Sequence, residues 1–135
     1  MMRRAACAGV IAAVAATAAC GAARASGAVR TVEIVAHFST FEPSTIQVDP
    51  GETVRFVIRN TDPIDHEFIV GDAQVQGVHE RGTESHHDPR PGEVSVPAGE
   101  TVATTYTFPA EGRLIFGCHL PGHYAFGMRG AFEIG

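Results

Sequence analysis

The chain has 135 residues, with 15 acidic and 10 basic side chains and a formal net charge of −5 at pH 7. This length suffices for one domain with its own apolar core and is too short for two. The acidic balance argues against nucleic acid and anionic membrane surfaces as partners, and favours a basic protein partner or plain solubility.

The N-terminal segment has the pattern of an export signal. Two arginines at positions 3 and 4 precede an apolar, alanine-rich run over residues 5–19, which is too short for a permanent membrane span. The sequence Ala-Arg-Ala at 23–25 matches a cleavage site that would release Ser26 as the new N-terminus. We therefore predict a signal over residues 1–25 and export to the periplasm or the outer face of the cytoplasmic membrane of a bacterium.

A second interpretation of the same segment stays open. Residues 17–20, Thr-Ala-Ala-Cys, resemble a bacterial lipobox, in which Cys20 would be lipidated and become the first residue. Under this alternative the protein is a lipoprotein, and the lipid on Cys20 is its link to a membrane. Both interpretations predict export.

The three cysteines are informative because only one belongs to the exported domain. Cys7 leaves with the signal, Cys20 is removed or lipidated, and Cys118 remains as a single thiol with no partner for an intramolecular disulfide. An unprotected thiol is a liability in an oxidising compartment, and a bound metal ion would protect it.

From residue 29 onward, short β-rich runs alternate with turn signals, a pattern typical of a sandwich or barrel. The clearest run is 53–59, in which apolar residues alternate with outward-facing arginines. Strands are expected at 29–38, 45–48, 53–59, 66–70, 93–96, 101–108, 113–117 and 128–134. We predict an all-β domain over residues 29–135, folded as a single antiparallel Greek-key β-sandwich of about seven or eight strands.

One segment, residues 72–92, departs from this pattern. It is polar and acidic, and we expect a long loop or excursion with at most a helical turn. Its three histidines, His79, His86 and His87, lie among acidic residues. The simpler interpretation is a solvated loop, and the alternative is a second, looser metal site. The acidic residues concerned are Glu80, Glu84 and Asp88.

Near the C-terminus, Cys118, His123 and Met128 recur as C-x4-H-x4-M on one short loop. Soft sulfur with imidazole favours copper, and two histidines, one cysteine and a weak axial methionine form the blue-copper ligand set. Pro121-Gly122 favours a tight reversal that turns the imidazole of His123 toward the cysteine.

A blue-copper site needs one further histidine from outside this loop. His66 is the best candidate, because it opens an apolar strand after an asparagine-containing loop. His119 follows Cys118 directly and would point the other way, so we predict that it is not a ligand. The remaining rivals are His37, on a strand face, and the three histidines of the 72–92 segment.

These residues resemble the cupredoxin (type 1 blue copper) family. The C-x4-H-x4-M loop is similar to that of auracyanin-, rusticyanin- and sulfocyanin-type members and close to that of azurin. The resemblance implies one copper ion per chain, cycling between Cu(II) and Cu(I), with His66, Cys118, His123 and Met128 as ligands. It also implies that Asn60 hydrogen-bonds across to the ligand loop beside the cysteine.

The function we expect is the transfer of single electrons between redox partners by an exported, monomeric copper protein. The port for electrons would be His123 or the apolar rim of Leu120, Pro121 and Phe126, facing a partner that is basic or carries an apolar patch. The alternative is a periplasmic copper-tolerance protein that sequesters or delivers copper. We expect no enzymatic activity, because a binuclear copper centre needs two loop cysteines and no acid or oxyanion motif accompanies Cys118.

Overall fold

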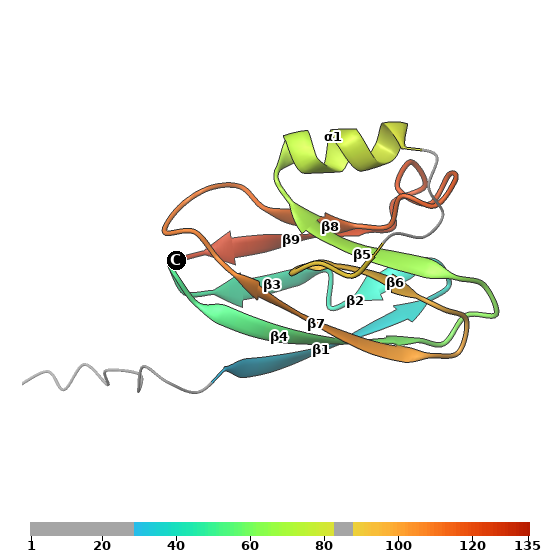
Figure 1. Ribbon diagram of the computed structural model, residues 1–135, viewed down its shortest axis with the longest axis horizontal. Coiled ribbons are helices and arrows are strands. Elements are labelled where there is room, and N and C mark those ends of the chain that lie inside the picture. The colour runs from blue at the N-terminus through green and yellow to red at the C-terminus, as the bar shows by residue number, and fades with distance from the viewer. Residues whose placement is uncertain (1–28, 83–87) are drawn as a thin grey trace, which may run out of the picture.

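The computed structural model describes residues 29–82 and 88–135, which form two packed β-sheets with one short helix (Figure 1). The predicted β-sandwich is confirmed. The signal at 1–25, with Cys7 and Cys20, lies outside the described residues. Within the part that is described, no helix is long and apolar enough to cross a membrane. The elements are β1 Arg30–His37, β2 Thr40–Glu42, β3 Thr45–Val48, β4 Thr53–Asn60, β5 His66–Gly71, α1 Ala73–Arg81, β6 Glu93–Val96, β7 Thr101–Thr107, β8 Ile115–Gly117 and β9 Arg129–Ile134.

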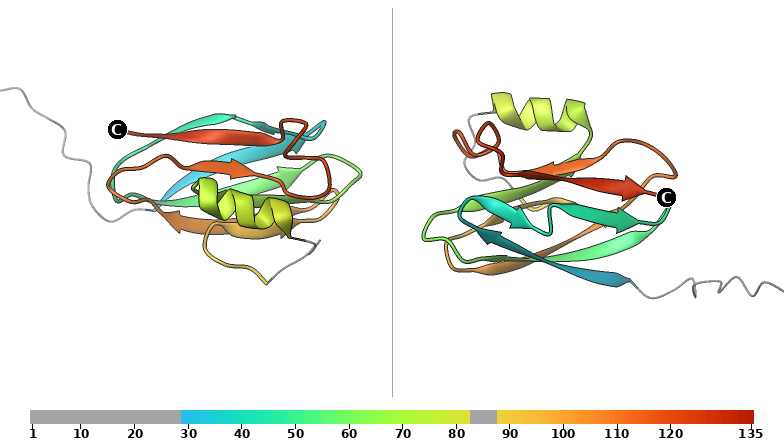
Figure 2. Two further views of the ribbon diagram at one scale, coloured as in Figure 1. Left: turned by 90° about the horizontal axis from the view of Figure 1, so that it is seen from above. Right: turned by 180° about the vertical axis from the view of Figure 1, so that it is seen from behind.

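The two sheets are not wholly antiparallel, which corrects the sequence-based expectation. One sheet has the order β2-β1-β4-β7 and the other β3-β9-β8-β5-β6. The pairs β1–β4 and β3–β9 are parallel. The chain leaves the first sheet to form β3 in the second and then returns. β4 therefore runs beside β1 in the same direction, without a hairpin between them (Figure 2).

Strand β2 is an element that the sequence did not predict, and it makes nine described strands instead of seven or eight. The chain reverses between β1 and β2 through Phe38 and Ser39, which have left-handed φ angles of 50° and 53°. Neither residue is a usual occupant of such a turn, which is why the turn carried no sequence signal. The reversal returns Phe41 to the core, where it is buried.

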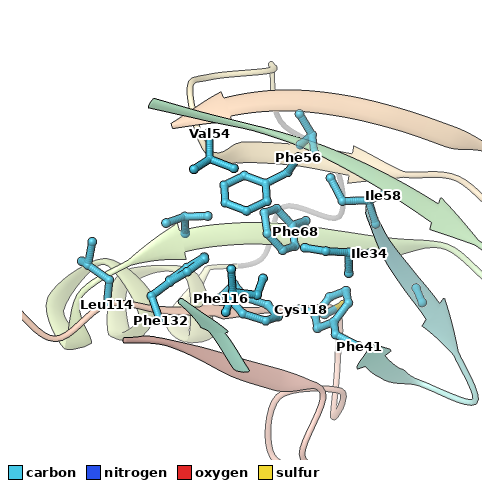
Figure 3. Packing of buried hydrophobic residues seen from close by; sticks show 14 of the residues in the cluster. Ile34, Phe41, Val54, Phe56, Ile58, Phe68, Leu114, Phe116, Cys118 and Phe132 are labelled. Atoms are coloured by element: carbon cyan, nitrogen blue, oxygen red, sulfur yellow. The ribbon is translucent and has the colours of Figure 1, made fainter. Parts of the chain in front are cut away.

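The core lies between the sheets and is rich in aromatic rings (Figure 3). The Phe68 ring lies 5.8 Å from that of Phe41, 5.4 Å from that of Phe56 and 5.3 Å from that of Phe116. Cys118 is fully buried and belongs to the same cluster. Its thiol therefore lies on a close-packed apolar base instead of on a solvent-exposed loop.

The segment 72–92 contains a helix of nine residues, α1, where the sequence indicated at most a helical turn. Asp72 caps its N-terminus by accepting hydrogen bonds from the backbone N–H groups of Gln74 and Val75, and the helix ends at Arg81, with Gly82 as its C-cap. The helix covers the outer face of β5 and β8 (Figures 1 and 2). All six residues of β5 are consequently buried, since the core covers their other face.

Candidate metal centre

His66, Cys118 and His123 meet at one end of the sandwich. Their candidate ligand atoms all lie within 4.8 Å of one another, and no other described residues form such a group. The Cys118 Sγ atom is 3.2 Å from Nδ1 of His123 and 4.0 Å from Nδ1 of His66. The two Nδ1 atoms are 3.3 Å apart. One sulfur and two imidazole nitrogens thus converge on a single point.

The loop between Cys118 and Met128 is closed by main-chain hydrogen bonds. The Cys118 N–H donates to the Met128 carbonyl (3.1 Å), and the Met128 N–H donates to the His123 carbonyl (2.9 Å). Gly122 and Gly127 have φ angles of 86° and 102°, a backbone region that glycine reaches without strain. The side chain of Met128 is fully buried. The loop therefore places all three predicted ligands at one end of the fold.

His66 comes from a different segment, at the start of β5, and it is 1% exposed. The other described histidines that were candidates for this ligand, His37 and His79, contact other groups. Nδ1 of His37 lies 2.8 Å from Thr61 Oγ1, and Nδ1 of His79 lies 2.9 Å from the Val75 carbonyl. His86 and His87 lie outside the described residues. The structure thus brings His66 to Cys118 as the sequence predicted, and its role as a ligand stays a prediction.

A buried carboxylate lies behind His66, and the sequence analysis missed it. Oδ2 of Asp62 is 2.8 Å from Nε2 of His66, on the side of the ring away from the thiol. Burial by itself would raise the pKa of Asp62. Hydrogen bonds from the Ser39 N–H, from His66 and from the Phe38 N–H outweigh burial and lower that pKa below its ordinary value. The sequence carries little indication of this buried position, because an aspartate in a loop usually faces solvent.

Asn60 does not make the contact that the family resemblance implied. Its side-chain amide donates to the carbonyl groups of Ile64, Val96 and Pro97 at 2.8, 3.0 and 3.1 Å. Its Oδ1 atom accepts from the N–H of Asp62 at 2.9 Å. Asn60 therefore stabilises the loop that precedes His66, instead of reaching the ligand loop.

Glu67 joins the two ligand segments instead. Its backbone N–H donates to Cys118 Sγ at 3.3 Å, and its carboxylate accepts from the His119 N–H at 3.3 Å. The residue is 2% exposed. Sequence reasoning did not single it out, because its position directly after a histidine carries no pattern of its own.

His119 faces away from the thiol, as predicted. Its ring nitrogens lie 2.8 Å from Glu80 Oε2 and 2.6 Å from Gln76 Oε1, both on α1. The ring also stacks on Tyr124 of the ligand loop, with centroids 4.5 Å apart. Helix α1 thus holds the outer side of this loop. Of the alternative second metal site, His79 Nε2 lies 3.6 Å from Glu93 Oε2. Glu84, His86 and His87 lie outside the described residues, so this alternative stays a prediction.

The protonation of the centre follows from its burial. Burial raises the pKa of the Cys118 thiol to about 11, an effect that the N–H groups of Glu67 and Leu120 reduce and the Glu67 charge increases. Burial also lowers the pKa of His123, as does the charge of His66, whereas Asp62 acts in the opposite direction. At neutral pH the metal-free centre therefore holds a thiol and a neutral His123 imidazole. A metal ion must displace the thiol proton to bind.

This donor set suits copper. A buried cysteine, two histidines and a buried methionine form a cluster consistent with a type 1 copper site, and its soft sulfur atoms would not attract a hard cation. Fold and site together define a small β-sandwich protein with a cluster of copper-type ligands at the end of its core.

The comparisons with known proteins agree. Residues 10–127 match the family model described as "Cupredoxin-like domain". The copper-resistant cuproprotein CopI of Pseudomonas aeruginosa is 32% identical in an alignment that covers 83% of this chain and 80% of that protein. CopI of Rubrivivax gelatinosus is 38% identical over 110 residues, 78% of this chain and 67% of that protein. The chain therefore belongs to the cupredoxin-like family.

The comparison with solved structures agrees with the observed fold. Reduced auracyanin from the photosynthetic bacterium Roseiflexus castenholzii superimposes with a TM-score of 0.66 and 24% sequence identity. The match covers 81% of this chain and 99% of auracyanin. At this level of identity the likeness concerns the sandwich fold alone.

Proposed function

We propose that this chain is an exported copper-tolerance protein that holds one copper ion at His66, Cys118 and His123, with Met128 as the weak axial ligand. The observation that carries the proposal is the convergence of one buried thiol and two imidazoles. The likeness to a copper-resistant cuproprotein over 80% of that protein's length supports tolerance over other uses of copper. The periplasm, or the outer face of the cytoplasmic membrane, is the proposed location.

The geometry suits retention of the ion. Bound copper would accept electron density from a thiolate and two imidazoles, a donor set that accommodates Cu(II) and Cu(I). Cys118 and His66 are buried, so the protein excludes water from the sulfur and from one imidazole. The main-chain bonds that close the ligand loop fix Cys118 and His123 before metal arrives, which reduces the ordering cost of binding.

The test compares the wild type with Cys118→Ser, which keeps the size of the side chain and removes the thiolate. The purified exported domain with Cu(II) should show an intense thiolate-to-copper absorption band, and the variant should lack it. In a copper-sensitive bacterial strain, the wild type should raise the copper concentration that stops growth, and the variant should not. A wild type that gives the band but no protection would refute the tolerance role and leave the copper site standing.

Electron transfer is the second candidate function. It is supported by the partly exposed His123 and by Phe126, which is 92% exposed beside it on the ligand loop. A basic redox protein, or one with an apolar patch, would dock there against the acidic chain. If the reduced wild type passes electrons rapidly to a basic cytochrome and His123→Gly does so slowly, this function is favoured. Equal rates would exclude His123 as the port.

A further inference from the structure

The Asp62 carboxylate contacts one of the candidate ligands of the centre, His66. It is 6% exposed, and its Oδ2 atom lies 2.8 Å from Nε2 of His66, whose side chain is fully buried. Nδ1 of the same ring points to the opposite side, toward the Cys118 sulfur. One imidazole thus connects a buried acid to the candidate copper position.

Hydrogen bonds hold both oxygens of the carboxylate and also the backbone of Asp62. Oδ1 accepts from the Phe38 N–H at 2.7 Å, and Oδ2 accepts from the Ser39 N–H at 2.8 Å. The Asp62 backbone N–H donates to Asn60 Oδ1 at 2.9 Å. The two left-handed residues of the β1–β2 turn therefore direct both of their N–H groups at one acid. In Figure 1 this turn lies at the same end of the sandwich as the ligand loop.

We infer that Asp62 is the positioning residue of the copper centre: it keeps the hydrogen of His66 on Nε2 and leaves the Nδ1 lone pair for the metal. Because both oxygens of this carboxylate already accept backbone N–H groups, the ring nitrogen that faces it is placed to donate, which favours the tautomer of His66 with its hydrogen on Nε2. Such an arrangement of acid, histidine and metal fixes the ring orientation and makes the ligand more basic. The inference rests on the proposed copper site.

An electrostatic consequence distinguishes this role from mere loop anchoring. A buried negative charge behind a ligand attracts a doubly charged ion more than a singly charged one. Asp62 should therefore stabilise Cu(II) more than Cu(I) and lower the reduction potential. If Asp62 only anchored the β1–β2 turn, its replacement would change the affinities for Cu(II) and Cu(I) equally.

The experiment uses Asp62→Asn with Asp65→Asn as the matched control. Asp65 lies in the same loop, and its Oδ1 atom accepts from the Ala98 N–H at 2.9 Å. We expect Asp62→Asn to bind Cu(II) about 10–100-fold more weakly, with a smaller change for Cu(I). Each tenfold difference between the two ions corresponds to a rise of about 59 mV in potential. Asp65→Asn should leave the potential near that of the wild type.

A measurement on the wild type makes the inference testable even if Asp62→Asn does not fold. In the Cu(I) protein, which is diamagnetic, NMR should show a slowly exchanging hydrogen on Nε2 of His66. An unchanged potential in Asp62→Asn, or a metal-bound Nε2, would overturn the role of Asp62 while the thiolate-to-copper band stands. A wild type without that band would overturn the copper site and this inference together.

Discussion

The Cys118 thiol has surroundings that serve a metal site better than a reactive cysteine. It is fully buried on an aromatic core, and its pKa of about 11 keeps it protonated at neutral pH. Reactive cysteines usually have lowered pKa values and partial exposure. A nucleophilic role for Cys118 is therefore disfavoured by its environment.

The same environment predicts a proton balance. At pH 7.5 the metal-free wild type should release about one proton when copper binds under anaerobic conditions, because the thiol must ionise to bind the metal. Calorimetry in buffers of different ionisation enthalpy measures this number. Cys118→Ser should release clearly less than the wild type, and equal release by both proteins would contradict the assignment of the proton to Cys118.

At the scale of elements, helix α1 supports the ligand loop through a narrow contact. Gly117, at the end of β8, lies against the Tyr124 ring and against Gln76 of the helix. A β-carbon at this position would lie 2.7 Å from Tyr124 Cδ2 and 3.2 Å from Gln76 Oε1. The absence of a side chain at Gly117 thus allows the helix, the loop and His119 to pack together.

We predict that Gly117→Ala lowers the free energy of unfolding of the metal-free protein by about 1–3 kcal/mol, since the aromatic ring must move. Gly77→Ala is the matched control. Its β-carbon would meet only Arg81, at 3.2 Å from the flexible end of that side chain. Alanine is favoured over glycine inside a helix, so the free energy of unfolding of this variant should rise by up to about 1 kcal/mol. Denaturant unfolding measures the stability of both variants. A Gly117→Ala protein that is more stable than Gly77→Ala would contradict the packing described for Gly117.

At the scale of the whole molecule, the centre is built from parts of both sheets. His66 belongs to the second sheet, whereas the β1–β2 turn that holds Asp62 belongs to the first. The His66 ring, the Asp62 carboxylate and the ligand loop meet only when the two sheets pack. Folding of the sandwich and assembly of the metal centre are therefore coupled, and protonation of the centre should affect the stability of the entire domain.

The pH dependence of metal-free stability tests this coupling. The folded-state pKa of His123 lies below its ordinary value of 6.5, so the unfolded chain binds protons more readily. The contribution of His123 is complete above about pH 6.5 and is lost as the pH falls toward the folded-state pKa. Unfolding free energies measured from pH 7.5 downward should therefore decrease less steeply for His123→Gln than for the wild type. Parallel curves would refute the prediction.

Much of the fold could be read from local patterns. The alternation of Val54, Phe56 and Ile58 indicated a strand with one buried face, and all three side chains are buried. Strand β2 and helix α1 could not be predicted from local patterns, for different reasons. The β1–β2 turn uses Phe38 and Ser39 at left-handed angles. The helix is largely polar and is held by tertiary contacts of Gln76 with β5 and β8.

The sequence by itself indicated the chemistry of the centre, because the one thiol of the predicted exported domain, spaced C-x4-H-x4-M, favours soft metal ions. It also singled out His66 by its place before an apolar strand. Only the tertiary structure decided which side chains surround these ligands. Asp62 and Glu67 are recognisable solely through contacts that span turns and sheets, at 2.8 Å from His66 and 3.3 Å from the Cys118 sulfur. Sequence patterns report the spacing of neighbours along a chain, whereas burial of a charge depends on segments that meet only after folding.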